Sequence, residues 1–574
     1  MVVFGINNDI MNLQELKITK EAPEWLTEDG YSTLCGGYLL PLETPKGMYS
    51  RVAKAAGNYY KKSEYWSEKF YKAMWNNWLC PASPILSNMG TNRGLPISCN
   101  SIHVGDSVDS IFDKSHELAM LSKNGAGVGI YLGDVRGRGT LIYGNGKSEG
   151  IIPWAKVYDT TTVSVSQGST RRGASAVYLP IDHIDIEEFL SIRRPTGDIN
   201  RRCLNLHQGI CINDTWMKSM IDGDKLKRLL WQEILKTRVE TGEPYLFFID
   251  NVNSQNPEMY KANGLSVKTS NICTEIFLHT DVDHSFVCCL SSLNLVKWEE
   301  WKNTDLPEIA VRFLDAVIEE YIQKAHNIPG LEASVKSAIK GRAIGIGVLG
   351  WHTLLQKNMI PFDSFGAMML NSQIFSMIKS HAEKESKHMA IELGEPEWCK
   401  GFNRRNTHLT AVAPTVSNSI ISGGYSAGIE PWAANIFSQK SAKGTFIPKN
   451  KVLECLLEFK GYNTPEIWKK INEQSGSVLG LSFLTDEEKQ VFLTAREINQ
   501  HTIIKQAAQR QKFIDQGQSI NLFFGANASP KYIHEVHLEA WKSGLKSLYY
   551  FRSEGVLRGD LASRSKEECA ACEG

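Results

Sequence analysis

Short apolar segments alternate with amphipathic helical segments over residues 176–450, and this alternation limits the possible folds more than any other feature of the chain. The strand candidates are rich in β-branched and aromatic residues and lie at residues 176–179, 245–249, 286–290, 344–348 and 409–412. Apolar residues at helical spacing mark segments 223–240, 306–325 and 370–393. Strands that alternate with helices form a mostly parallel sheet, open or closed into a barrel, so we expect an α/β domain.

The segments on either side of this region have a different character. Residues 1–95 look mainly helical, because apolar and aromatic residues recur at helical spacing over residues 49–78. Further helical patterns cover residues 105–123, 154–165, 450–518 and 533–546. The end of the chain is charged and rich in small residues, so we expect it to be mobile. We predict three parts, at residues 1–95, 96–552 and 553–574.

The composition argues against several classes of protein. Lys+Arg and Asp+Glu are balanced at 63 each, so the chain as a whole does not attract nucleic acid. No apolar run approaches the roughly 18 residues of a membrane span, and the N-terminal segment lacks the features of a signal peptide. We therefore expect a cytoplasmic protein without a membrane or nucleic-acid partner. Its 12 cysteines are then expected to be reduced, and redox or catalytic use of them is an open possibility.

An amide, a thiol and a carboxylate alternate at Asn271, Cys273 and Glu275. In an extended loop, alternate side chains point to the same side. The thiol could then abstract hydrogen or act as a nucleophile, while the amide orients a ligand and the carboxylate moves protons. The alternative is a polar strand end with a half-buried cysteine, which is a common structural feature.

Other cysteines also suggest redox chemistry. Cys569 and Cys572 form a terminal CxxC, and the chain has no second CxxC that could complete a zinc site with it. On a mobile tail, such a pair could exchange disulfides. That implies an internal disulfide in need of reduction, for which Cys99 with Cys288 or Cys289 are the candidates.

Three polar or aromatic motifs each allow two interpretations. Glycine-rich loops at residues 136–139 and 167–173 carry arginines and suit an anionic ligand, or they are ordinary surface loops. A hydroxyl-rich turn at residues 414–419 precedes a helix and suits phosphate, or it is a simple helix cap. The adjacent Tyr549 and Tyr550 are amphipathic packing residues, or they relay an electron and a proton. The glycine-spaced run at residues 125–130 follows a helix and leads into a strand, which excludes a Rossmann turn.

Taken together and in order, these motifs resemble the large (alpha) subunit of class I ribonucleotide reductase. The resemblance runs from about residue 25 to the end and rests on Gly-Asp-Ser-Val-Asp-Ser-Ile at 105–111, Ser-Gln-Gly-Ser-Thr-Arg-Arg-Gly-Ala at 166–174, Asn-x-Cys-x-Glu at 271–275, Cys-x-Leu-Ser-Ser-Leu-Asn-Leu at 288–295, Gly-Ile-Glu-Pro at 428–431, Gln-Lys-Phe-Ile-Asp-Gln at 511–516, the tyrosine pair and the terminal CxxC. It implies a ten-stranded α/β barrel made of two antiparallel-related halves. A central finger loop would carry Cys273, and a small helical N-terminal domain would precede the barrel.

The resemblance also implies the chemistry, which is the reduction of ribonucleoside diphosphates to 2′-deoxyribonucleotides for DNA synthesis. Cys273 would become a thiyl radical that abstracts the ribose 3′ hydrogen, while Glu275 takes the 3′-hydroxyl proton and Asn271 binds the ribose. Cys99 and Cys288 would protonate the departing 2′-hydroxyl and supply two electrons, ending as a disulfide.

Three partners are implied by the same resemblance. Cys569 and Cys572 would reduce the internal disulfide and be reset by thioredoxin or glutaredoxin. Nothing in this sequence could generate a radical, so a separate small (beta) subunit with a diiron or dimanganese-type centre would supply it through Tyr549 and Tyr550. The chain itself would bind no metal and no cofactor. The residues implied for substrate binding, besides Asn271 and Glu275, are Ser83, Ser98, Pro414, Thr415, Ser417, Asn418 and Ser419.

Regulation is implied as well. A deoxynucleoside or adenosine triphosphate effector would bind at a specificity site near the interface of a homodimer, which helices at 107–123 and 153–166 would form. The residues implied for this site are Asp106, Ser107, Arg136, Gln167 and Arg171. Too few residues precede the helical domain to encode an ATP cone, so we expect no on/off inhibition by dATP through such a module.

Some features depart from the family pattern or leave alternatives open. Val416 and Asn418 differ from the residues that many relatives have, which affects the details of phosphate binding, and Cys289 replaces a commoner polar residue. A cobalamin-dependent (class II) reductase would not need the tyrosine relay, and a glycyl-radical enzyme would need a glycine motif that the tail lacks. A catalytically silent nucleotide-binding regulator is the alternative from another class. The compact form suits a bacterium or a virus equally. For a viral protein, the expected location is the cytoplasm of the host.

Overall fold

The computed structural model describes residues 12–165, 173–437, 439–441, 444–446 and 448–553. Five parallel strands form one half of a barrel, and their order in the sheet follows the sequence. They are β2 (Cys99–His103), β3 (Gly127–Tyr131), β4 (Ala174–Pro180), β5 (Leu206–Ile212) and β6 (Tyr245–Phe248). All of their residues except Cys99 and Pro180 are buried, as expected for parallel strands covered on both faces.

The second half of the barrel is also parallel but less regular. It begins with β7 (Phe286–Asn294) and β8 (Ile344–Leu349), which pair in parallel. Isolated parallel bridges then join Ile346 to Thr410 and Val412 to Gln518. The last pair is β11 (Leu522–Phe524) with β13 (Phe551–Ser553), again parallel.

Two antiparallel seams close the sheet. β7 pairs with β2, and β12 (Ser547–Leu548), which directly precedes β13, pairs with β6. Among the described residues, ten segments therefore form a closed ring of two five-stranded parallel halves. The predicted ten-stranded α/β barrel with antiparallel-related halves is confirmed. A further short strand, β1 (Leu79–Pro81), pairs with the outer end of β7.

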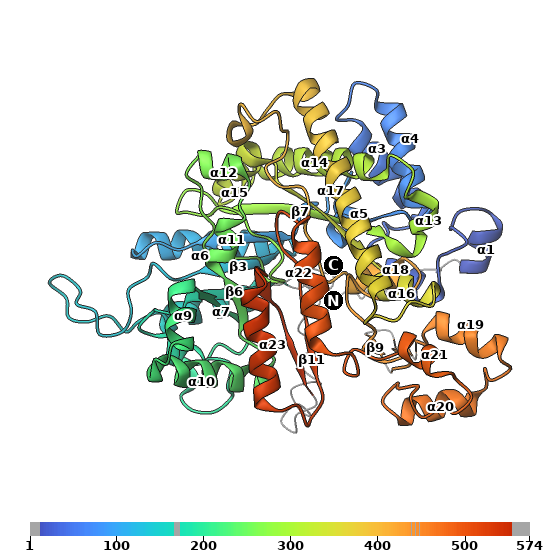
Figure 1. Cartoon of the computed structure of the whole chain (residues 1–574). Helices are drawn as coiled ribbons and strands as arrows, with labels where there is room; N and C mark the ends of the chain where they lie inside the picture. The colour runs from blue at the N-terminus through green and yellow to red at the C-terminus, as the bar shows by residue number, and fades with distance from the viewer. Residues whose placement is uncertain (1–11, 166–172, 438, 442–443, 447, 554–574) are drawn as a thin grey trace, which may run out of the picture.

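Helices surround the barrel, as Figure 1 shows. Those that precede it are α1 (Leu13–Ile18), α2 (Glu28–Cys35), α3 (Pro45–Gly57), α4 (Ser63–Trp75) and α5 (Ser83–Asn88). Those of the first half are α6 (Val108–Lys123), α7 (Ile152–Ser164), α8 (Ile186–Phe189), α9 (Asp214–Ile221), α10 (Lys225–Thr241), α11 (Ile249–Ser254) and α12 (Glu258–Ala262). Those of the second half are α13 (Trp298–Trp301), α14 (Leu306–Ala325), α15 (Glu332–Gly341), α16 (Trp351–Lys357), α17 (Phe365–Leu393), α18 (Val416–Ile421), α22 (Gln500–Gln511) and α23 (Pro530–Lys542).

A small satellite lies between α18 and α22 in the sequence. It consists of α19 (Lys451–Phe459), α20 (Pro465–Glu473), α21 (Asp486–Val491) and the ribbon of β9 (Gln439–Ser441) with β10 (Gly444–Phe446). Its apolar residues form their own cluster around Leu457 and Trp468. One continuous core, by contrast, joins the N-terminal helices to the barrel.

The helical pattern at residues 49–78 proves to be two helices. α3 ends at Gly57 and α4 begins at Ser63. A Cβ atom at Gly57 would lie 2.0 Å from the Ser67 hydroxyl, so glycine lets the two helices meet closely where the chain reverses. The helical spacing over residues 49–78 continues across this turn, so the spacing alone does not reveal the break between the two helices.

Within the part of the chain that the structure describes, no helix combines the length and the apolar content needed to cross a bilayer.

Candidate active site

A loop between α12 and β7 runs through the barrel and carries Cys273. Its close approach to β3 is possible because β3 has two glycines: a Cβ at Gly129 would lie 1.9 Å from the Ser270 carbonyl oxygen, and one at Gly127 would lie 2.7 Å from Ile272 Cγ2. On the other side of the loop, Gly517 N donates a hydrogen bond to the Glu275 carbonyl oxygen at 2.8 Å. The loop is therefore held between the two halves of the barrel, and the glycine-spaced run at residues 125–130 makes room for it.

The segment with Asn271, Cys273 and Glu275 is a turn, and the expectation of an extended loop was wrong. Asn271 Oδ1 accepts hydrogen bonds from the backbone N–H groups of Glu275 and Ile276, both at 3.1 Å. Thr274, between the thiol and the carboxylate, has a φ of 61°. These hydrogen bonds to the Asn271 side chain thus hold the backbone in a turn, and the turn brings Asn271, Cys273 and Glu275 together.

Long-range contacts fix this turn. The Tyr178 hydroxyl donates to the Asn271 carbonyl oxygen at 2.6 Å, and the Ser547 hydroxyl donates to the Thr274 carbonyl oxygen at 2.7 Å. The Ser519 hydroxyl lies 2.6 Å from the Cys273 carbonyl oxygen. Since these contacts come from β4, β12 and the segment before β11, both halves of the barrel position the thiol.

The Glu275 carboxyl is suited to proton transfer near neutral pH. It is buried, and this burial raises its pKa to about 7, although hydrogen bonding from Asn271, its own backbone and Ser519 opposes the shift. Ser519 Oγ lies 3.1 Å from Glu275 Oε2. The buried Asn271 amide can hydrogen-bond the Glu275 carboxyl through one N–H group, and its second N–H group is available to a ligand. A pKa near the working pH is what a general base requires.

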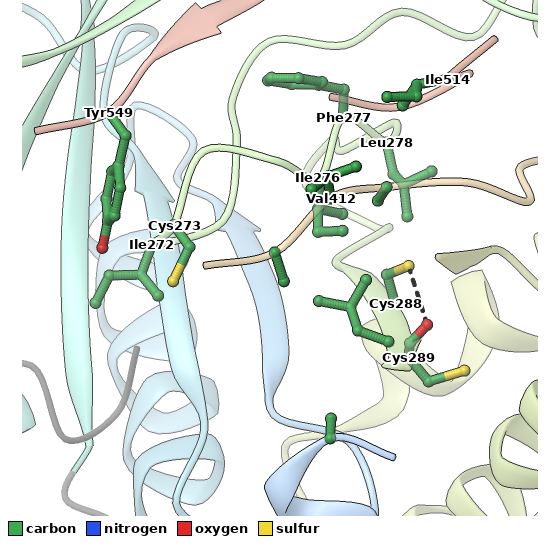
Figure 2. Close-up of a cluster of buried hydrophobic side chains, with 14 of the residues drawn as sticks. Ile272, Cys273, Ile276, Phe277, Leu278, Cys288, Cys289, Val412, Ile514 and Tyr549 are labelled. Atoms are coloured by element: carbon green, nitrogen blue, oxygen red, sulfur yellow. Dashed lines mark hydrogen bonds between the residues drawn. The ribbon is translucent and has the colours of Figure 1, made fainter. Parts of the chain in front are cut away.

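Cys99 and Cys288 are direct neighbours across the seam between β2 and β7, where their Cα atoms are register partners. Directly opposite residues of antiparallel strands have the Cα separation that a disulfide needs. Gln516 Nε2 lies 3.3 Å from Cys288 Sγ. Figure 2 shows Cys288 in the same buried cluster as Cys273 and Tyr549.

Cys289 faces the other side of β7. Its sulfur lies 3.3 Å from the Leu314 carbonyl oxygen of α14, outside the barrel wall, and in Figure 2 the sulfurs of Cys288 and Cys289 point apart. Successive side chains of a strand point to opposite faces, so only one of the two cysteines can reach the interior. The strand register therefore brings Cys288, and not Cys289, to Cys99.

Tyr549 and Tyr550 lie within a cluster of buried aromatic rings. Their ring centroids are 4.3 Å apart, and the Tyr245 ring on β6 lies 4.7 Å from Tyr549 and 5.1 Å from Tyr550. The Tyr550 hydroxyl lies 3.4 Å from His207 Nδ1, which in turn lies 2.6 Å from Glu243 Oε1. The cluster thus offers contiguous phenols with a polar group next to the outer hydroxyl.

The hydroxyl-rich turn at residues 414–419 contains the start of α18. Thr415 has a φ of 52°, and its hydroxyl accepts a hydrogen bond from Gly428 N at 2.7 Å. Asn418 Nδ2 donates to the Pro81 carbonyl oxygen at 3.0 Å, while Ser419 donates back to the Thr415 carbonyl oxygen at 2.9 Å. Pro414 leads into the turn, and Ser417 is half-buried in the first turn of the helix. Several of these hydroxyls and amides are therefore engaged in holding the turn itself.

Ser83 and Ser98 both precede β2 in the sequence. Ser83 begins α5 and its hydroxyl lies 2.7 Å from the Tyr38 hydroxyl. Ser98 is buried directly before Cys99 at the start of β2. Ser98 therefore lies next to the thiol pair, whereas Ser83 is tied to the helical region.

The residues predicted for an effector site are only partly described. Ser107 caps α6 by accepting a hydrogen bond from Ser110 N, and Arg136 Nε pairs with Asp106 Oδ2 at 2.8 Å on the surface. Gln167 and Arg171 lie outside the described residues, as do Cys569 and Cys572 of the tail.

Three contributors to the site were missed from the sequence: Gln516, Ser519 and Tyr245. Gln516 ends a motif that is visible in the sequence, but neither it nor Ser519 stands in an apolar pattern that predicts a strand. Tyr245 was recognised only as the start of a strand. The signal that could have found them is the polar alternation at residues 516–519 next to glycine, which is typical of a segment that lines a site.

One group of described residues has the side-chain types and spacing to hold a metal ion. The ligand atoms of His279, Asp281 and His284 all lie within 4.8 Å of one another. The Asp281 carboxylate is already hydrogen-bonded to both imidazoles, at 3.1 Å from His279 and 2.9 Å from His284. These contacts stabilise the tight hairpin that leads into β7.

A buried carboxyl, an amide, three thiols and a set of phenols inside one closed barrel define the site of a thiol-based oxidoreductase. Comparison with known proteins agrees with this class. The model of the ribonucleotide reductase all-alpha domain matches residues 24–94, and the model of the ribonucleotide reductase barrel domain matches residues 97–227, 225–404 and 399–551.

Relatives match over nearly the whole chain. The ribonucleoside-diphosphate reductase large subunit of Invertebrate iridescent virus 3 is 36% identical, over 93% of this chain and 96% of that protein. The large subunit from Arabidopsis thaliana is 30% identical, over 92% and 76%. The solved structure of the Actinobacillus ureae class Id ribonucleotide reductase alpha subunit is 43% identical, with a TM-score of 0.86 over 93% of this chain and 98% of that one. The chain belongs to the ribonucleotide reductase large-subunit family, and its activity is the reduction of ribonucleotides to deoxyribonucleotides.

Proposed function

We propose that Cys273 carries a thiyl radical that abstracts the 3′ hydrogen of a ribonucleoside diphosphate, with Glu275 as general base and Asn271 as ribose ligand. The observation that carries this proposal is the placement of the Cys99–Cys288 pair on the wall of the barrel through which the Cys273 loop passes. A site for radical reduction needs a hydrogen abstractor, a base and a two-electron donor. The proposal is supported by the fact that Cys273 and Cys288 belong to one buried core, against which Cys99 packs, and that Glu275 is buried two residues from Cys273.

The proposed steps balance. The Cys273 sulfur gains the 3′ hydrogen and leaves a carbon radical, and Glu275 takes the 3′-hydroxyl proton. The 2′-hydroxyl leaves as water with a proton from the thiol pair. Cys99 and Cys288 supply two electrons and become a disulfide, and the hydrogen of the second thiol passes to the 2′ carbon. Glu275 returns its proton to the 3′ oxygen, and Cys273 returns its hydrogen to the 3′ carbon, which restores the thiyl radical. The buried Glu275, whose pKa is about 7, exists in both protonation states near neutral pH and can accept and return a proton.

The radical is proposed to enter through Tyr550 and Tyr549 from a separate small subunit. The metal centre of that partner, of the diiron or dimanganese type, supplies the oxidising equivalent. Contiguous phenols support this route, because ring centroids 4.3 Å apart allow short electron-transfer steps. Tyr245 extends the same cluster from β6, within 5.1 Å of either ring.

The proposed substrate, effector and reductant sites follow the family pattern. Ser83, Ser98 and the 414–419 turn would bind the nucleotide, and Asp106, Ser107 and Arg136 with Gln167 and Arg171 would bind a nucleoside triphosphate effector. A homodimer through α6 and α7 would join two effector sites. Cys569 and Cys572 would reduce the Cys99–Cys288 disulfide and be regenerated by thioredoxin or glutaredoxin.

The test is formation of dCDP from CDP by the full chain with a metal-loaded small subunit, dithiothreitol and ATP. Tyr550→Phe keeps the ring but cannot lose a hydroxyl proton, so we expect product formation to fall to background. Tyr462→Phe, which changes a partly exposed tyrosine of the satellite, is the matched control and should retain activity. Full turnover by Tyr550→Phe would refute the relay, and turnover without any partner but with adenosylcobalamin would point to class II chemistry.

A further inference from the structure

The carboxamide of Gln516 contacts one thiol of the proposed redox pair, and its orientation is determined by its other contacts. Its Oε1 lies 3.3 Å from Phe277 N and accepts a hydrogen bond there. Its Nε2 lies 2.9 Å from the Ile344 carbonyl oxygen and 3.3 Å from Cys288 Sγ. Because an amide N–H only donates and a carbonyl oxygen only accepts, the NH₂ group must face the sulfur.

The two cysteines of the pair differ in exposure to solvent. Cys288 is 1% exposed, whereas Cys99 is half-buried at the start of β2. Disulfide exchange requires a thiolate to approach one sulfur directly. An external dithiol therefore reaches the Cys99 sulfur first, and the sulfur that leaves is that of Cys288.

A leaving sulfur carries negative charge, and the surroundings of Cys288 disfavour it. Burial raises the pKa of the Cys288 thiol well above its usual value, and the nearby Cys289, Cys99 and Glu275 raise it further. The hydrogen bond from Gln516 acts in the opposite direction and lowers this pKa. A donor to the charged form of a buried group favours that form.

We propose that Gln516 is the positioning residue that makes Cys288 the leaving group when the Cys99–Cys288 disulfide is reduced. This inference rests on the proposed function, in which that disulfide forms at each turnover. The external thiolate bonds to the Cys99 sulfur, the Cys99–Cys288 bond breaks, and Cys288 departs as a thiolate held by the Gln516 NH₂ group. The second thiol of the donor then releases Cys99 and forms the donor's own disulfide. Two electrons thus pass to the pair, and the two protons that the donor thiols lose end on Cys99 and Cys288.

Gln516 also hydrogen-bonds to three parts of the site. This one residue can therefore determine the position of the Cys288 sulfur. Phe277 follows the Cys273 loop, Cys288 lies on β7 and Ile344 begins β8. The carboxamide thus fixes the position of the thiol strand relative to the loop that bears the proposed radical. This arrangement depends on both the donor and the acceptor of the side chain.

The test is the rate at which dithiothreitol reduces the Cys99–Cys288 disulfide in the full chain, followed by differential alkylation and mass spectrometry. The chain carries Cys569→Ser and Cys572→Ser so that only the external dithiol acts. Gln516→Met has a similar shape but no donor, and we expect reduction to slow about tenfold or more, since a hydrogen bond to a charged group contributes roughly 1.5–3 kcal/mol. The pH at which Cys288 becomes reactive to iodoacetamide in the reduced protein should also rise.

Gln518→Met is the matched control, because Gln518 is equally buried but donates to the Ala507 carbonyl oxygen at 3.0 Å and contacts no cysteine. We expect its reduction rate and alkylation profile to match those of the parent. Should Gln516→Met not fold, Gln516→Glu replaces the donor with an acceptor and should slow reduction even more. Unchanged rates in a folded Gln516 variant would overturn this inference alone, whereas absence of any Cys99–Cys288 disulfide after oxidation would count against the proposed function.

Discussion

At the scale of single residues, Glu275 shows that the active site works against the stability of the fold. A carboxyl group buried among Asn271, Ser519 and the loop backbone is hard to ionise, so its pKa rises from 4.5 to about 7. The unfolded chain ionises this group at lower pH than the folded chain does. Stability therefore falls as pH rises from about 4.5 through about 7, and a difference of this size corresponds to about 3 kcal/mol.

Glu275→Gln should separate the role of the carboxyl group in catalysis from its effect on stability. The amide cannot accept the 3′-hydroxyl proton, so we expect CDP reduction to fall at least about 100-fold, in line with the loss of a general base. The same variant should be more stable than the parent at pH 8, by up to about 3 kcal/mol, and equally stable near pH 4.5. Urea unfolding at the two pH values measures this difference. A variant that is less stable than the parent at pH 8 would show that the buried carboxylate does not destabilise the fold.

The residues that the sequence alone identifies are those with distinctive chemistry. Cys273, Glu275 and Asn271 were recognised by type and spacing, but their turn could not be, because it depends on Tyr178 and Ser547 from distant strands. The residues alone left Cys288 and Cys289 as alternatives and only the family resemblance favoured Cys288, whereas the register places Cys288 opposite Cys99. The sequence alone does not show the long-range contacts that determine how these residues are arranged in space.

At the scale of elements, the barrel is arranged so that a loop can pass through it. β3 lacks side chains at Gly127 and Gly129, where the loop backbone comes closest. In the second half of the barrel, regular strand pairing is reduced to isolated bridges at Thr410, Val412 and Gln518. α14 was predicted to its exact bounds because its apolar stripe is continuous, whereas residues 516–518 were assigned to a helical region and lie in the barrel wall. Gln516 binds the thiol strand and the loop, and Gln518 binds α22, so the segment shows no apolar alternation.

Gly129→Ala tests whether this close approach positions the thiol. The added methyl group would lie 1.9 Å from the Ser270 carbonyl oxygen, so the loop must move. We expect CDP reduction to drop at least about tenfold, because small misplacements of reacting groups are costly. Gly366→Ala, on α17 with its nearest neighbour at 3.5 Å, is the control and should keep full activity. Equal activity in both variants would show that the loop does not depend on β3.

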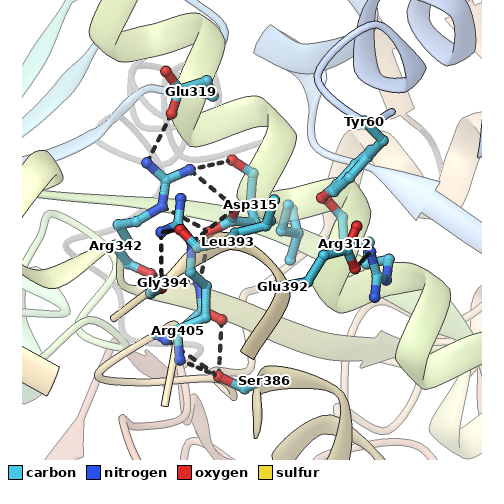
Figure 3. A network of polar contacts seen from close by, with 12 residues as sticks. Tyr60, Arg312, Asp315, Glu319, Arg342, Ser386, Glu392, Leu393, Gly394 and Arg405 are labelled. Carbon is cyan, nitrogen blue, oxygen red and sulfur yellow. Dashed lines mark hydrogen bonds and ion pairs between the residues drawn. The ribbon is translucent and has the colours of Figure 1, made fainter. Parts of the chain in front are cut away.

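A buried polar network holds the outer helices of the second half together (Figure 3). Arg342, at the end of α15, contacts Asp315 Oδ1 and Glu319 Oε2 of α14, each at 2.8 Å. Arg405 lies 3.5 Å from the same aspartate and also bonds the end of α17. Tyr60 of the N-terminal region donates to the Arg312 carbonyl oxygen of α14 at 2.6 Å. α14 thus connects the N-terminal helices with the barrel.

Arg342→Met should destabilise the protein by about 3–5 kcal/mol, because it leaves the buried Asp315 carboxylate without a main partner. Lys72→Met, which removes an exposed ion pair with Glu68, is the control and should leave the urea midpoint nearly unchanged. The urea midpoint measures both. Similar midpoints for the two variants would mean that Arg405 alone compensates the buried charge of Asp315.

At the scale of the whole molecule, the surface of α6 and α7 is the region expected to join two chains. Val108, Phe112 and Val163 are large apolar residues exposed on these adjacent helices. The Phe112 ring packs on Trp154 of α7 at 6.4 Å, so the two helices present one apolar face. The Asp106–Arg136 pair of the proposed effector site lies next to its edge. Effector binding and dimerisation would then be linked through one surface.

If the proposed dimer forms through this surface, Phe112→Asp should yield a monomer, because a carboxylate would be buried without a partner at the interface. Phe365→Asp changes an even more exposed phenylalanine on α17 and should leave the mass unchanged. Sedimentation or light scattering with and without dTTP measures both variants. A Phe112→Asp protein of undiminished mass would place the dimer contact elsewhere on the molecule.

The most direct test of the account is the amount of dCDP that Cys273→Ser forms with a metal-loaded small subunit, CDP, dithiothreitol and ATP. A hydroxyl at this position cannot form the hydrogen-abstracting radical, so the predicted result is no dCDP above background. Cys289→Ser, which alters the thiol that faces α14, should retain turnover in the same assay. Steady dCDP formation by Cys273→Ser would contradict the central claim that this one sulfur starts the reaction.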